Sequence, residues 1–344
     1  MVAGLTEGGV LVLSLLVPFA LLLILFPSYL RFLIRLGRVS EDAHKSPPTK
    51  VPEPAGPLLF AGLIVGELVV AAGFDSFIPV ALVLSAGVAF AIGFADDIYV
   101  LGGKTKPLLL LLAGLTFVSV IAFKPNLYQS FLAFPVLGDT GPHFIIFTAL
   151  VIVAFPVVAN AFNMMDAFNG EISWFTLLTS LTLVVGVTLR EIFEGGFSVS
   201  RVASTLPLVG VAAAFLIYNR YPSKAFDGDS GSLMFGAMFA GLAITSGVEV
   251  AAIIAIVPAI LNSFYILASV RGFVERRRMA SRPTYVGSDG LLHASTEKDA
   301  PNTLVRLVLL ASPMSEKELV RNIISLTELA CVFSVAISVL TWVH

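Results

Sequence analysis

The chain has 344 residues, of which 57% are hydrophobic and only 13% are charged. A soluble domain carries about 25% charged residues, so this composition excludes an ordinary soluble enzyme and places the chain in a lipid bilayer. The formal net charge of −2 gives no general attraction to nucleic acid, and we expect no nucleic-acid partner. The single cysteine, Cys331, cannot form an internal disulfide, so cysteine usage indicates neither an oxidising nor a reducing compartment.

Long apolar segments recur along the whole chain. A membrane-spanning helix needs roughly 20 mainly apolar residues, and about ten segments meet that rule. The first segment is too long, and lacks the basic flank, to be a cleavable signal peptide. In chain order the segments are 10–30, 57–72, 77–94, 107–123, 144–162, 172–188, 206–218, 230–244, 250–270 and 322–343. The sequence therefore predicts an all-α, polytopic membrane protein with about ten transmembrane helices, in a single domain over residues 1–344.

The connecting loops fall alternately on two sides of the membrane, and the basic residues are divided unequally between them. One set of loops holds 18 of the 21 Lys and Arg residues, whereas the other holds only Lys124, Arg190 and Arg201. Because Lys and Arg accumulate in cytoplasmic loops, the basic set is predicted to be cytoplasmic, with both termini outside. The basic set includes one long loop, 271–321. We expect the protein in the cell membrane or the endoplasmic reticulum membrane.

Five aspartates stand at span ends on the predicted cytoplasmic side. Placed there, carboxylates avoid the insertion penalty of roughly 2.5–3.5 kcal/mol at the bilayer centre and can converge on one pocket. These residues are Asp96, Asp97, Asp166, Asp227 and Asp229. Their shared side predicts an active site on the cytoplasmic face.

The first candidate motif is the pair Asp96-Asp97, followed by Lys106. Adjacent acids supply negative charge for Mg²⁺ or a proton acceptor, and a nearby lysine can hold phosphate as a point charge. A helix end that runs into a solvated turn explains the same residues equally well.

The second motif, residues 160–170, places Asn160, Asn163 and Asp166 at intervals of three, on one face of a helix, ahead of Asn169. Amide and carboxylate oxygens suit a hard cation or a hydroxyl group. Asn and Asp before a glycine also serve helix ends and turns, but four polar groups exceed what a turn needs, which favours a functional interpretation.

The third motif is Phe226-Asp227-Gly228-Asp229-Ser230-Gly231-Ser232, which opens a span. A helix N-terminus attracts phosphate, and an aspartate beside a phosphate site is well placed to hold Mg²⁺. Asp229 or Ser230 is equally suited to a plain helix cap. Phe226 could stack on a base or anchor the chain at the membrane interface.

The fourth motif is the arginine run Arg276-Arg277-Arg278 with Arg282. It is interpreted either as a topology signal that meets anionic lipid or as a clamp for a diphosphate, whose oxygens match guanidinium groups. The chain has no nucleotide P-loop, zinc-type histidine pair or Ser-His-Asp signature. Together the motifs indicate phosphoryl transfer at one membrane face. An ion-coupled transporter is the alternative, although its acids would lie near the midplane.

In these motifs the chain resembles the polyprenyl-phosphate N-acetylhexosamine-1-phosphate transferase family. Asp42-Ala43-His44-Lys45 with residues 51–56 is similar to that family's first cytoplasmic loop, and the other motifs follow in the family's order over nearly the whole chain. Residues 276–292 look more like the loop of the dolichol-type enzymes than the histidine-rich loop of the peptidoglycan enzyme.

The resemblance implies transfer of N-acetylglucosamine-1-phosphate from UDP-GlcNAc to a polyprenyl (dolichyl) phosphate, with release of UMP. This reaction would be the first step of lipid-linked oligosaccharide assembly for protein glycosylation; another UDP-N-acetylhexosamine is the alternative donor. The implied cofactor is Mg²⁺, with Mn²⁺ as an alternative, and a homodimer is compatible with the sequence. The implied residues are catalytic Asp96, Asp97 and Lys106, metal-binding Asn163 and Asp229, and substrate-binding Asp42, Lys45, Glu53, Asn169, Phe226, Arg276, Arg278 and Arg282.

Overall fold

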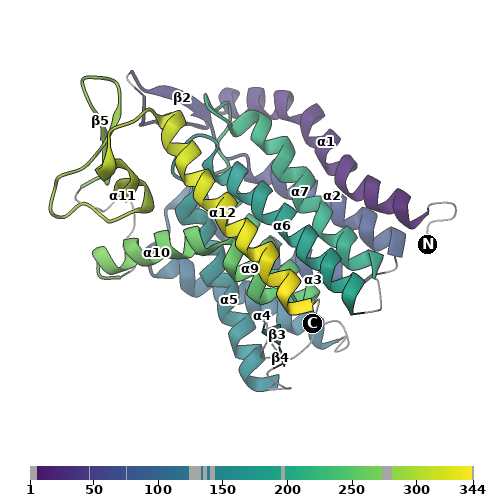
Figure 1. The fold of residues 1–344 in the computed structure, drawn as a ribbon. Coiled ribbons are helices and arrows are strands. Elements are labelled where there is room, and N and C mark those ends of the chain that lie inside the picture. Colours follow the sequence, from purple (N-terminus) through teal and green to yellow (C-terminus); the bar gives the residue numbers. More distant parts are fainter. Residues whose placement is uncertain are drawn as a thin grey trace.

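The structure is a computed structural model that describes residues 6–45, 47–74, 76–123, 133–134, 138–139, 144–194, 198–272 and 281–342. Within these residues the fold is mostly helical (Figure 1). The helices are α1 (Glu7–Arg35), α2 (Gly56–Phe74), α3 (Ile78–Tyr99), α4 (Thr105–Ala122), α5 (Phe144–Met165), α6 (Glu171–Phe193), α7 (Val199–Asn219), α8 (Gly228–Ser246), α9 (Glu249–Ala255), α10 (Val257–Ser269), α11 (Leu304–Ala311) and α12 (Glu316–Trp342). The strands are β1 (Val39–Asp42), β2 (Thr49–Pro52), β3 (Ala133–Phe134), β4 (Gly138–Asp139), β5 (Thr284–Val286) and β6 (Leu292–Ala294).

Among the described helices, eight are long and apolar enough to cross a membrane: α1 to α7 and α12. The pair α9 and α10 passes the same test when taken together, but it is bent by 65°, so it is a broken ninth candidate. The chain is therefore a multi-pass membrane protein. Helix α8, which the sequence predicted as a span, is not among the candidates, because Asp229 and its Gly, Ser and Thr residues lower its hydropathy.

Helix α8 is instead the centre of the bundle. It contacts α2, α3, α5, α6, α7 and α9, and all of its residues except Asp229 are buried. Between helices in a lipid bilayer the hydrophobic effect is weak, so they associate mainly by van der Waals packing. Small residues let the helix backbones approach closely enough for that packing. A Cβ on Gly236 would lie 2.6 Å from the Ala159 Cα atom of α5, and one on Gly93 of α3 would lie 2.6 Å from the Ser230 nitrogen. The second contact fixes the start of α8 against α3.

Arg190 of α6 caps the C-terminal end of α8. Its guanidinium donates to the carbonyl of Ser246, the last residue of α8, and to Glu194 at 2.9 Å, and it lies 5.1 Å from the ring of Trp342. A positive charge at a helix C-terminus also interacts favourably with the helix dipole. Arg190 thus joins α6, α8 and α12 far from the first turn of α8.

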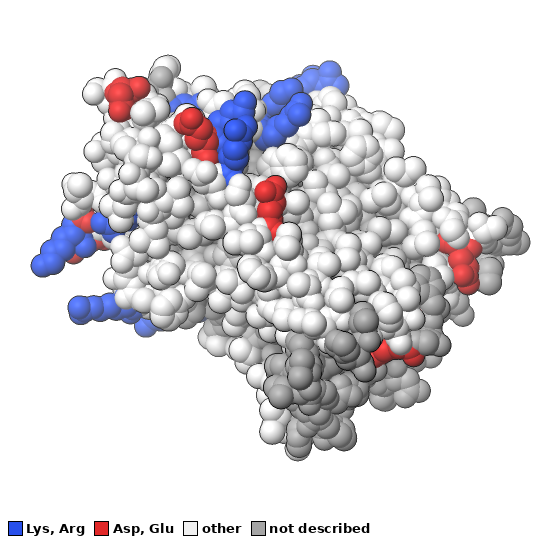
Figure 2. All heavy atoms as spheres, in the orientation of Figure 1, with Lys and Arg blue, Asp and Glu red and all other residues white. Residues whose placement is uncertain are grey.

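The two ends of the bundle differ in structure and in charge. The hairpins β1–β2 and β5–β6 lie at one end with α11, and the two termini of the described chain lie at the other (Figure 1). On the face drawn in Figure 2, the Lys and Arg side chains gather along the edges that correspond to the hairpin end. On this face the Lys and Arg side chains are therefore concentrated at the hairpin end, whereas Asp and Glu side chains also appear at the opposite end.

The prediction of a helical polytopic protein is confirmed, and the described chain adds three antiparallel two-stranded sheets that the sequence did not predict. Their strands have only two to four residues, too short for an alternating pattern to be recognised. The predicted 271–321 loop holds β5, β6 and α11, and α12 begins within it at Glu316. The predicted span 250–270 is broken at Ile256, just before Pro258 at the start of α10, where proline removes a helix hydrogen bond.

Candidate active site

Four helices meet at a polar group of side chains at the hairpin end of the bundle, the Asp229 cluster, which consists of Asp96, Lys106, Asn163, Asp229 and Ser232. The Lys106 ammonium lies 2.7 Å from Asp96 Oδ2 and also pairs with Asp229. Asn163 Nδ2 donates to Asp229 Oδ1 and to Ser232 Oγ, in both cases at 2.9 Å. The fold thus brings the first three sequence motifs into direct contact, from α3, α4, α5 and α8.

Asp97 faces the first turn of α8, whereas its neighbour Asp96 faces Lys106. Asp97 Oδ1 accepts a hydrogen bond from the Asp229 backbone nitrogen at 2.8 Å, and Oδ2 accepts one from the Ser230 nitrogen at 3.1 Å. The N-cap residue Asp227 makes no side-chain cap bond, so Asp97 satisfies these free helix donors from another helix. The sequence predicted the two acids as one catalytic pair, and the structure gives them different partners.

The Asp229 cluster has the donor chemistry of a site for a hard divalent cation. Carboxylate, amide and hydroxyl oxygens are available from Asp96, Asp229, Asn163 and Ser232, and rotating the Asn163 amide by 180° turns its oxygen toward Asp229. The Asp229 side chain is 27% exposed, so a ligand can reach it. Asp96 and Asp229 together carry more negative charge than Lys106 offsets. The residues present therefore fit Mg²⁺.

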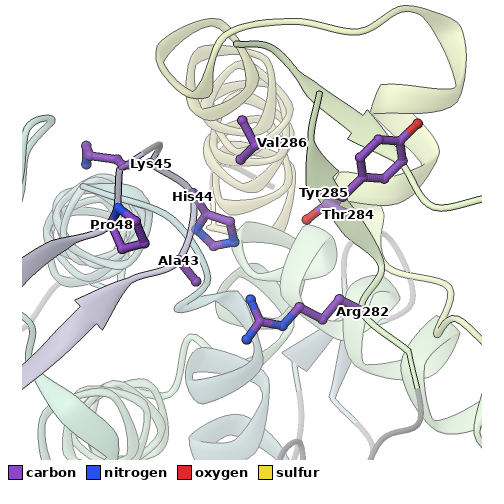
Figure 3. Close-up of a pocket in the computed structure, with 8 residues that line it drawn as sticks. All are labelled: Ala43, His44, Lys45, Pro48, Arg282, Thr284, Tyr285 and Val286. Carbon is purple, nitrogen blue, oxygen red and sulfur yellow. The ribbon is translucent and has the colours of Figure 1, made fainter. Parts of the chain in front are cut away.

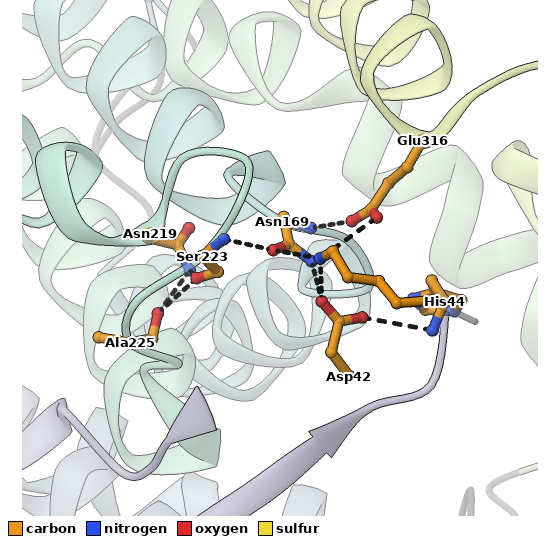
Figure 4. Close-up of polar contacts among 8 residues, drawn as sticks. Asp42, His44, Asn169, Asn219, Ser223, Ala225 and Glu316 are labelled. Carbon is orange, nitrogen blue, oxygen red and sulfur yellow. Dashed lines mark hydrogen bonds and ion pairs between the residues drawn. The ribbon is translucent and has the colours of Figure 1, made fainter. Parts of the chain in front are cut away.

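A second polar group, the Asn169 cluster, consists of Asp42, Lys45, Asn169, Ser223 and Glu316 (Figure 4). Asn169 lies at its centre: Nδ2 donates to Asp42 at 3.0 Å, and Oδ1 accepts from the Ser223 nitrogen at 2.6 Å and from Lys45 at 3.2 Å. The Asn169 backbone nitrogen donates to Glu316 Oε1 at 3.0 Å. This network joins the β1–β2 loop, the α5–α6 turn and the first residue of α12.

Charge within the Asn169 cluster is held by ion pairs. Lys45 pairs with Asp42 and lies 3.7 Å from Glu316 Oε2. Burial alone would raise the pKa of Asp42, but hydrogen bonds from Lys45 and Asn169 outweigh it and lower that pKa below its usual range. Asp42, His44 and Glu316 also each offer an atom within 4.8 Å of the others, as a metal site would. Because the Lys45 ammonium already supplies positive charge to Asp42 and Glu316, we do not assign a cation there.

A pocket of about 310 Å³ opens beside the Asn169 cluster, between the β1–β2 loop and the β5–β6 hairpin (Figure 3). Figure 3 shows the Arg282 side chain extending from the β5 side toward the loop of Ala43 and His44. The His44 ring stacks on Phe168, with 4.1 Å between the ring centroids. The lining residues are Ala43, His44, Lys45, Pro48, Arg282, Thr284, Tyr285 and Val286. Two cationic side chains therefore border a cavity that is open to a ligand.

The third motif is joined to the first loop through its backbone. The Phe226 nitrogen donates to the Pro52 carbonyl at 3.0 Å, and the Ala55 nitrogen donates to the Phe226 carbonyl at 2.8 Å. Next to these bonds, Ser40 hydrogen-bonds to the Glu53 carboxylate. Burial, and then the negative charge of Asp166, raises the pKa of Asp227 well above its usual range. Glu53 and Phe226 are thus held in one segment that leads directly to Asp229.

The predicted site residues that the structure describes all lie at the hairpin end: Asp97 lies at the first turn of α8, and the others are in the Asp229 cluster, the Asn169 cluster, the pocket or the joined segment. Arg276 and Arg278 lie outside the described residues, so their predicted contacts stay predictions. The third motif included Ser232 but gave it no role, and sequence reasoning missed Glu316. Ser232 follows Asp229 by three residues on one helix, and its role could have been found from that spacing. Nothing in the sequence near Glu316 pointed to Asn169.

Comparison with known proteins gives a consistent result. The family model described as "Glycosyl transferase family 4" matches residues 79–247, which include the Asp96-Asp97, Asn163 and Asp229 motifs. Among curated relatives, a protein of Sulfolobus acidocaldarius named "Putative UDP-N-acetylglucosamine--dolichyl-phosphate N-acetylglucosaminephosphotransferase" is 23% identical over 341 residues, covering 96% of this chain and 97% of the relative.

Two further relatives have other transferase names. A protein of Methanocaldococcus jannaschii, named as a glycosyltransferase, is 29% identical and covers 81% of each chain. A "Phospho-N-acetylmuramoyl-pentapeptide-transferase" of Shouchella clausii is 25% identical and covers 78% of this chain and 84% of the relative. The fold and the polar clusters at one end of the bundle define a multi-pass membrane protein with an enzyme-like site. The central part of this chain, residues 79–247, matches the model of glycosyl transferase family 4, and its relatives over most of its length carry transferase names.

Proposed function

We propose that the chain transfers N-acetylglucosamine-1-phosphate from UDP-GlcNAc to a polyprenyl phosphate such as dolichyl phosphate, and releases UMP. The match to the family model and the names of the relatives support this reaction class. It would be the first step in the assembly of a lipid-linked oligosaccharide.

The observation that carries the proposal is the Asp229 cluster. Lys106, held between Asp96 and Asp229, offers a fixed positive charge where phosphate groups would enter. Phosphoryl transfer relies mainly on positioning and on electrostatic stabilisation of phosphate oxygens, so a lysine among oxygen donors is suited to it. A site of this composition at the end of the bundle can meet a lipid phosphate at the membrane surface and a nucleotide from water.

The proposed transfer requires few protein side chains. A phosphate monoester has a second pKa near 6, so the lipid phosphate is largely dianionic at neutral pH. One of its oxygens attacks the β-phosphorus of UDP-GlcNAc, a new P–O bond forms, and the bond from the β-phosphorus to the bridging oxygen breaks. UMP leaves with that oxygen. Lys106 binds phosphate oxygens, and Asp96 keeps the ammonium oriented.

Asp229 and Asn163 would hold Mg²⁺, which would neutralise diphosphate charge when bound. The Asn169 cluster, the pocket and Arg282 would receive the nucleotide sugar, with Glu53 and Phe226 at its edge. Lys45 and Arg282 lie on opposite sides of the pocket and would bind a diphosphate as an ammonium and a guanidinium group.

We infer that the hairpin end faces the cytoplasm. The β1–β2 loop, the start of α4, the α7–α8 loop and the segment between α10 and α12 contain most of the basic set of residues, and positive residues accumulate on the cytoplasmic side. UDP-sugars would then reach the site from the cytosol, and both termini would lie outside.

The alternative, an ion-coupled transporter, would bind ions near the bilayer midplane in broken spans. Asp96, Asp97 and Asp229 lie at helix ends instead, and the described break between α9 and α10 contains no acid. These positions favour the transferase.

The proposal is tested by incubating purified protein with Mg²⁺, polyprenyl phosphate and single UDP-sugars, and by measuring UMP release. We expect UDP-GlcNAc to give the highest kcat/KM. A site that hydrogen-bonds an N-acetyl group rejects glucose, because buried polar partners would be left unpaired. Equal kcat/KM for UDP-glucose would contradict the choice of sugar, and absence of UMP release with every donor would contradict the reaction. UDP-MurNAc-pentapeptide, the donor type suggested by the Shouchella clausii name, belongs in the same panel.

A further inference from the structure

Asn262 is a buried polar residue on an otherwise apolar helix. It lies in α10, whose sequence is VPAILNSFYILAS, and only 5% of its surface is exposed. A buried amide in a membrane helix is costly unless its donor and acceptor are both satisfied. The hydrogen bonds of Asn262 go to Met164 and Leu304, which are not predicted site residues, and none of the sequence motifs includes Asn262.

Both ends of the Asn262 amide are hydrogen-bonded to the backbone of other elements. Nδ2 donates to the Met164 carbonyl of α5 at 2.7 Å, and Oδ1 accepts from the Leu304 nitrogen of α11 at 2.8 Å. Met164 is in the last turn of α5, where carbonyls lack helix partners, and Leu304 is in the first turn of α11, where nitrogens lack them. An amide supplies the donor and the acceptor from two different atoms, so it can reach two backbone partners at once.

The two bonds lead to the two halves of the candidate site. Met164 directly follows Asn163, which contacts Asp229 and Ser232. Leu304 begins the helix whose Arg306 donates to the Ser295 carbonyl at 3.1 Å, and the Ser295 nitrogen donates to the Pro283 carbonyl at 2.9 Å. Pro283 lies between Arg282 and Thr284, which both line the pocket.

We propose that Asn262 is a positioning residue that holds the end of α5, and with it Asn163, at a fixed place relative to the loop that carries the pocket. The proposal rests on the function proposed above. The 65° bend after α9 lets α10 lie against both α5 and α11, which a straight continuation of α9 would not do. Asn262 then links metal binding at the Asp229 cluster to the loop that borders the nucleotide-sugar pocket.

Three variants separate this role from simple packing. Asn262→Asp keeps the size and the acceptor for Leu304 but replaces the donor with a carboxylate oxygen that faces the Met164 carbonyl. Asn262→Leu removes both bonds. Ser269→Ala is the matched control, because Ser269 Oγ accepts from the Asn302 nitrogen at 2.9 Å and so joins the same helix to the same loop without contact to α5.

The experiment is a Mg²⁺ titration of the full-length variants with two readouts. The first is the increase in the thermal unfolding midpoint as MgCl₂ is added, which needs no turnover. The second is the Mg²⁺ concentration for half-maximal UMP release. Residues behind metal ligands typically change metal affinity by about 10–100-fold, so Asn262→Asp should need about tenfold more Mg²⁺ in both readouts. Ser269→Ala should titrate like the wild type, and Asn262→Leu should also raise the KM for the UDP-sugar.

An Asp that keeps its proton at this buried position still donates to the Met164 carbonyl, so an unchanged Mg²⁺ titration of both Asn262→Asp and Asn262→Leu would overturn the proposal. An equal shift in Ser269→Ala would overturn it as well. If Asn262→Asp does not fold, Asn262→Gln decides by the same readouts, because its longer side chain displaces both partners: a shifted titration supports the role and an unshifted one overturns it. The thermal readout separates this inference from the proposed function. A wild-type protein that binds Mg²⁺ but releases no UMP would contradict the function alone.

Discussion

Asp229 is the residue on which the account of the site depends most, because it contacts Lys106 and Asn163 and has an exposed edge. We expect Asp229→Asn to lower kcat by about 10³-fold, as loss of a charge that stabilises the transition state does. The substitution keeps the side-chain shape, and Asp97 still caps α8, so the unfolding midpoint should stay close to that of the wild type. Near wild-type turnover at saturating Mg²⁺ would remove Asp229 from the proposed metal site.

Asp97 gives a second residue-scale prediction, because its two contacts are those of a helix cap. Asn at this position keeps an acceptor for α8, whereas Ala removes both bonds at a cost of about 0.5–2 kcal/mol, the usual value for a lost cap. We therefore expect Asp97→Ala to lower both kcat and the unfolding midpoint, and Asp97→Asn to retain more of each. Equal inactivation of the two variants at an unchanged midpoint would instead make Asp97 a proton acceptor.

Lys106→Ala is the comparison for these two variants, because Lys106 caps no helix.

The sequence predicted that Asp96, Lys106, Asn163 and Asp229 belong together, since all lie at span ends on one predicted side. It could not predict how the acids divide between Lys106 and α8. That division depends on the packing of α3 against α8, 132 residues further along the chain from Asp97. Glu316 was missed for the same reason.

At the scale of elements, most helices were predictable because a membrane span carries a strong, local apolar signal. The central position of α8 could not be predicted, because a helix rich in Gly, Ser and Ala looks like a weak span. The small residues are explained by the close packing of the neighbouring helices, which the structure shows. The break between α9 and α10 was also missed, because both halves are apolar and Pro258 alone did not separate them. Burial and packing, not composition, distinguish these cases.

Arg190 provides a prediction about how these elements are held together. Replacing it with Met removes the bond to the Ser246 carbonyl and the ion pair with Glu194 but keeps an apolar side chain of similar length. Because hydrogen bonds from charged groups contribute about 1.5–3 kcal/mol, the free energy of unfolding should fall by about 2 kcal/mol, with kcat retained in the folded fraction. Thermal unfolding in detergent measures this loss.

Arg201→Met is the matched control for Arg190, because Arg201 pairs with Glu191 while 28% of its own side chain is exposed. Its partner Glu191 is buried but keeps a hydrogen bond from the Ser198 nitrogen at 2.7 Å, so the loss should be smaller than at Arg190. Equal destabilisation by the two substitutions would contradict a special role for Arg190.

At the scale of the whole molecule, the polar clusters and the basic residues lie at one end, and the orientation of that end in the membrane can be measured. We expect a membrane-impermeant maleimide to label Gly8→Cys but not Lys50→Cys in intact cells, since both positions are exposed and lie at opposite ends. The buried Cys331 is first replaced by Ser. Labelling of Lys50→Cys alone would reverse the proposed topology.

The most direct test of the central claim follows the β-phosphorus of the donor. UDP-GlcNAc labelled with ³²P at the β-phosphate is incubated with the purified protein, Mg²⁺ and polyprenyl phosphate, and the lipid and nucleotide products are separated. Transfer of a sugar phosphate predicts that the label moves to the lipid and that unlabelled UMP is released, with no transfer by Asp229→Asn. Label recovered in UDP, beside a lipid that has gained the sugar without phosphorus, would contradict the account.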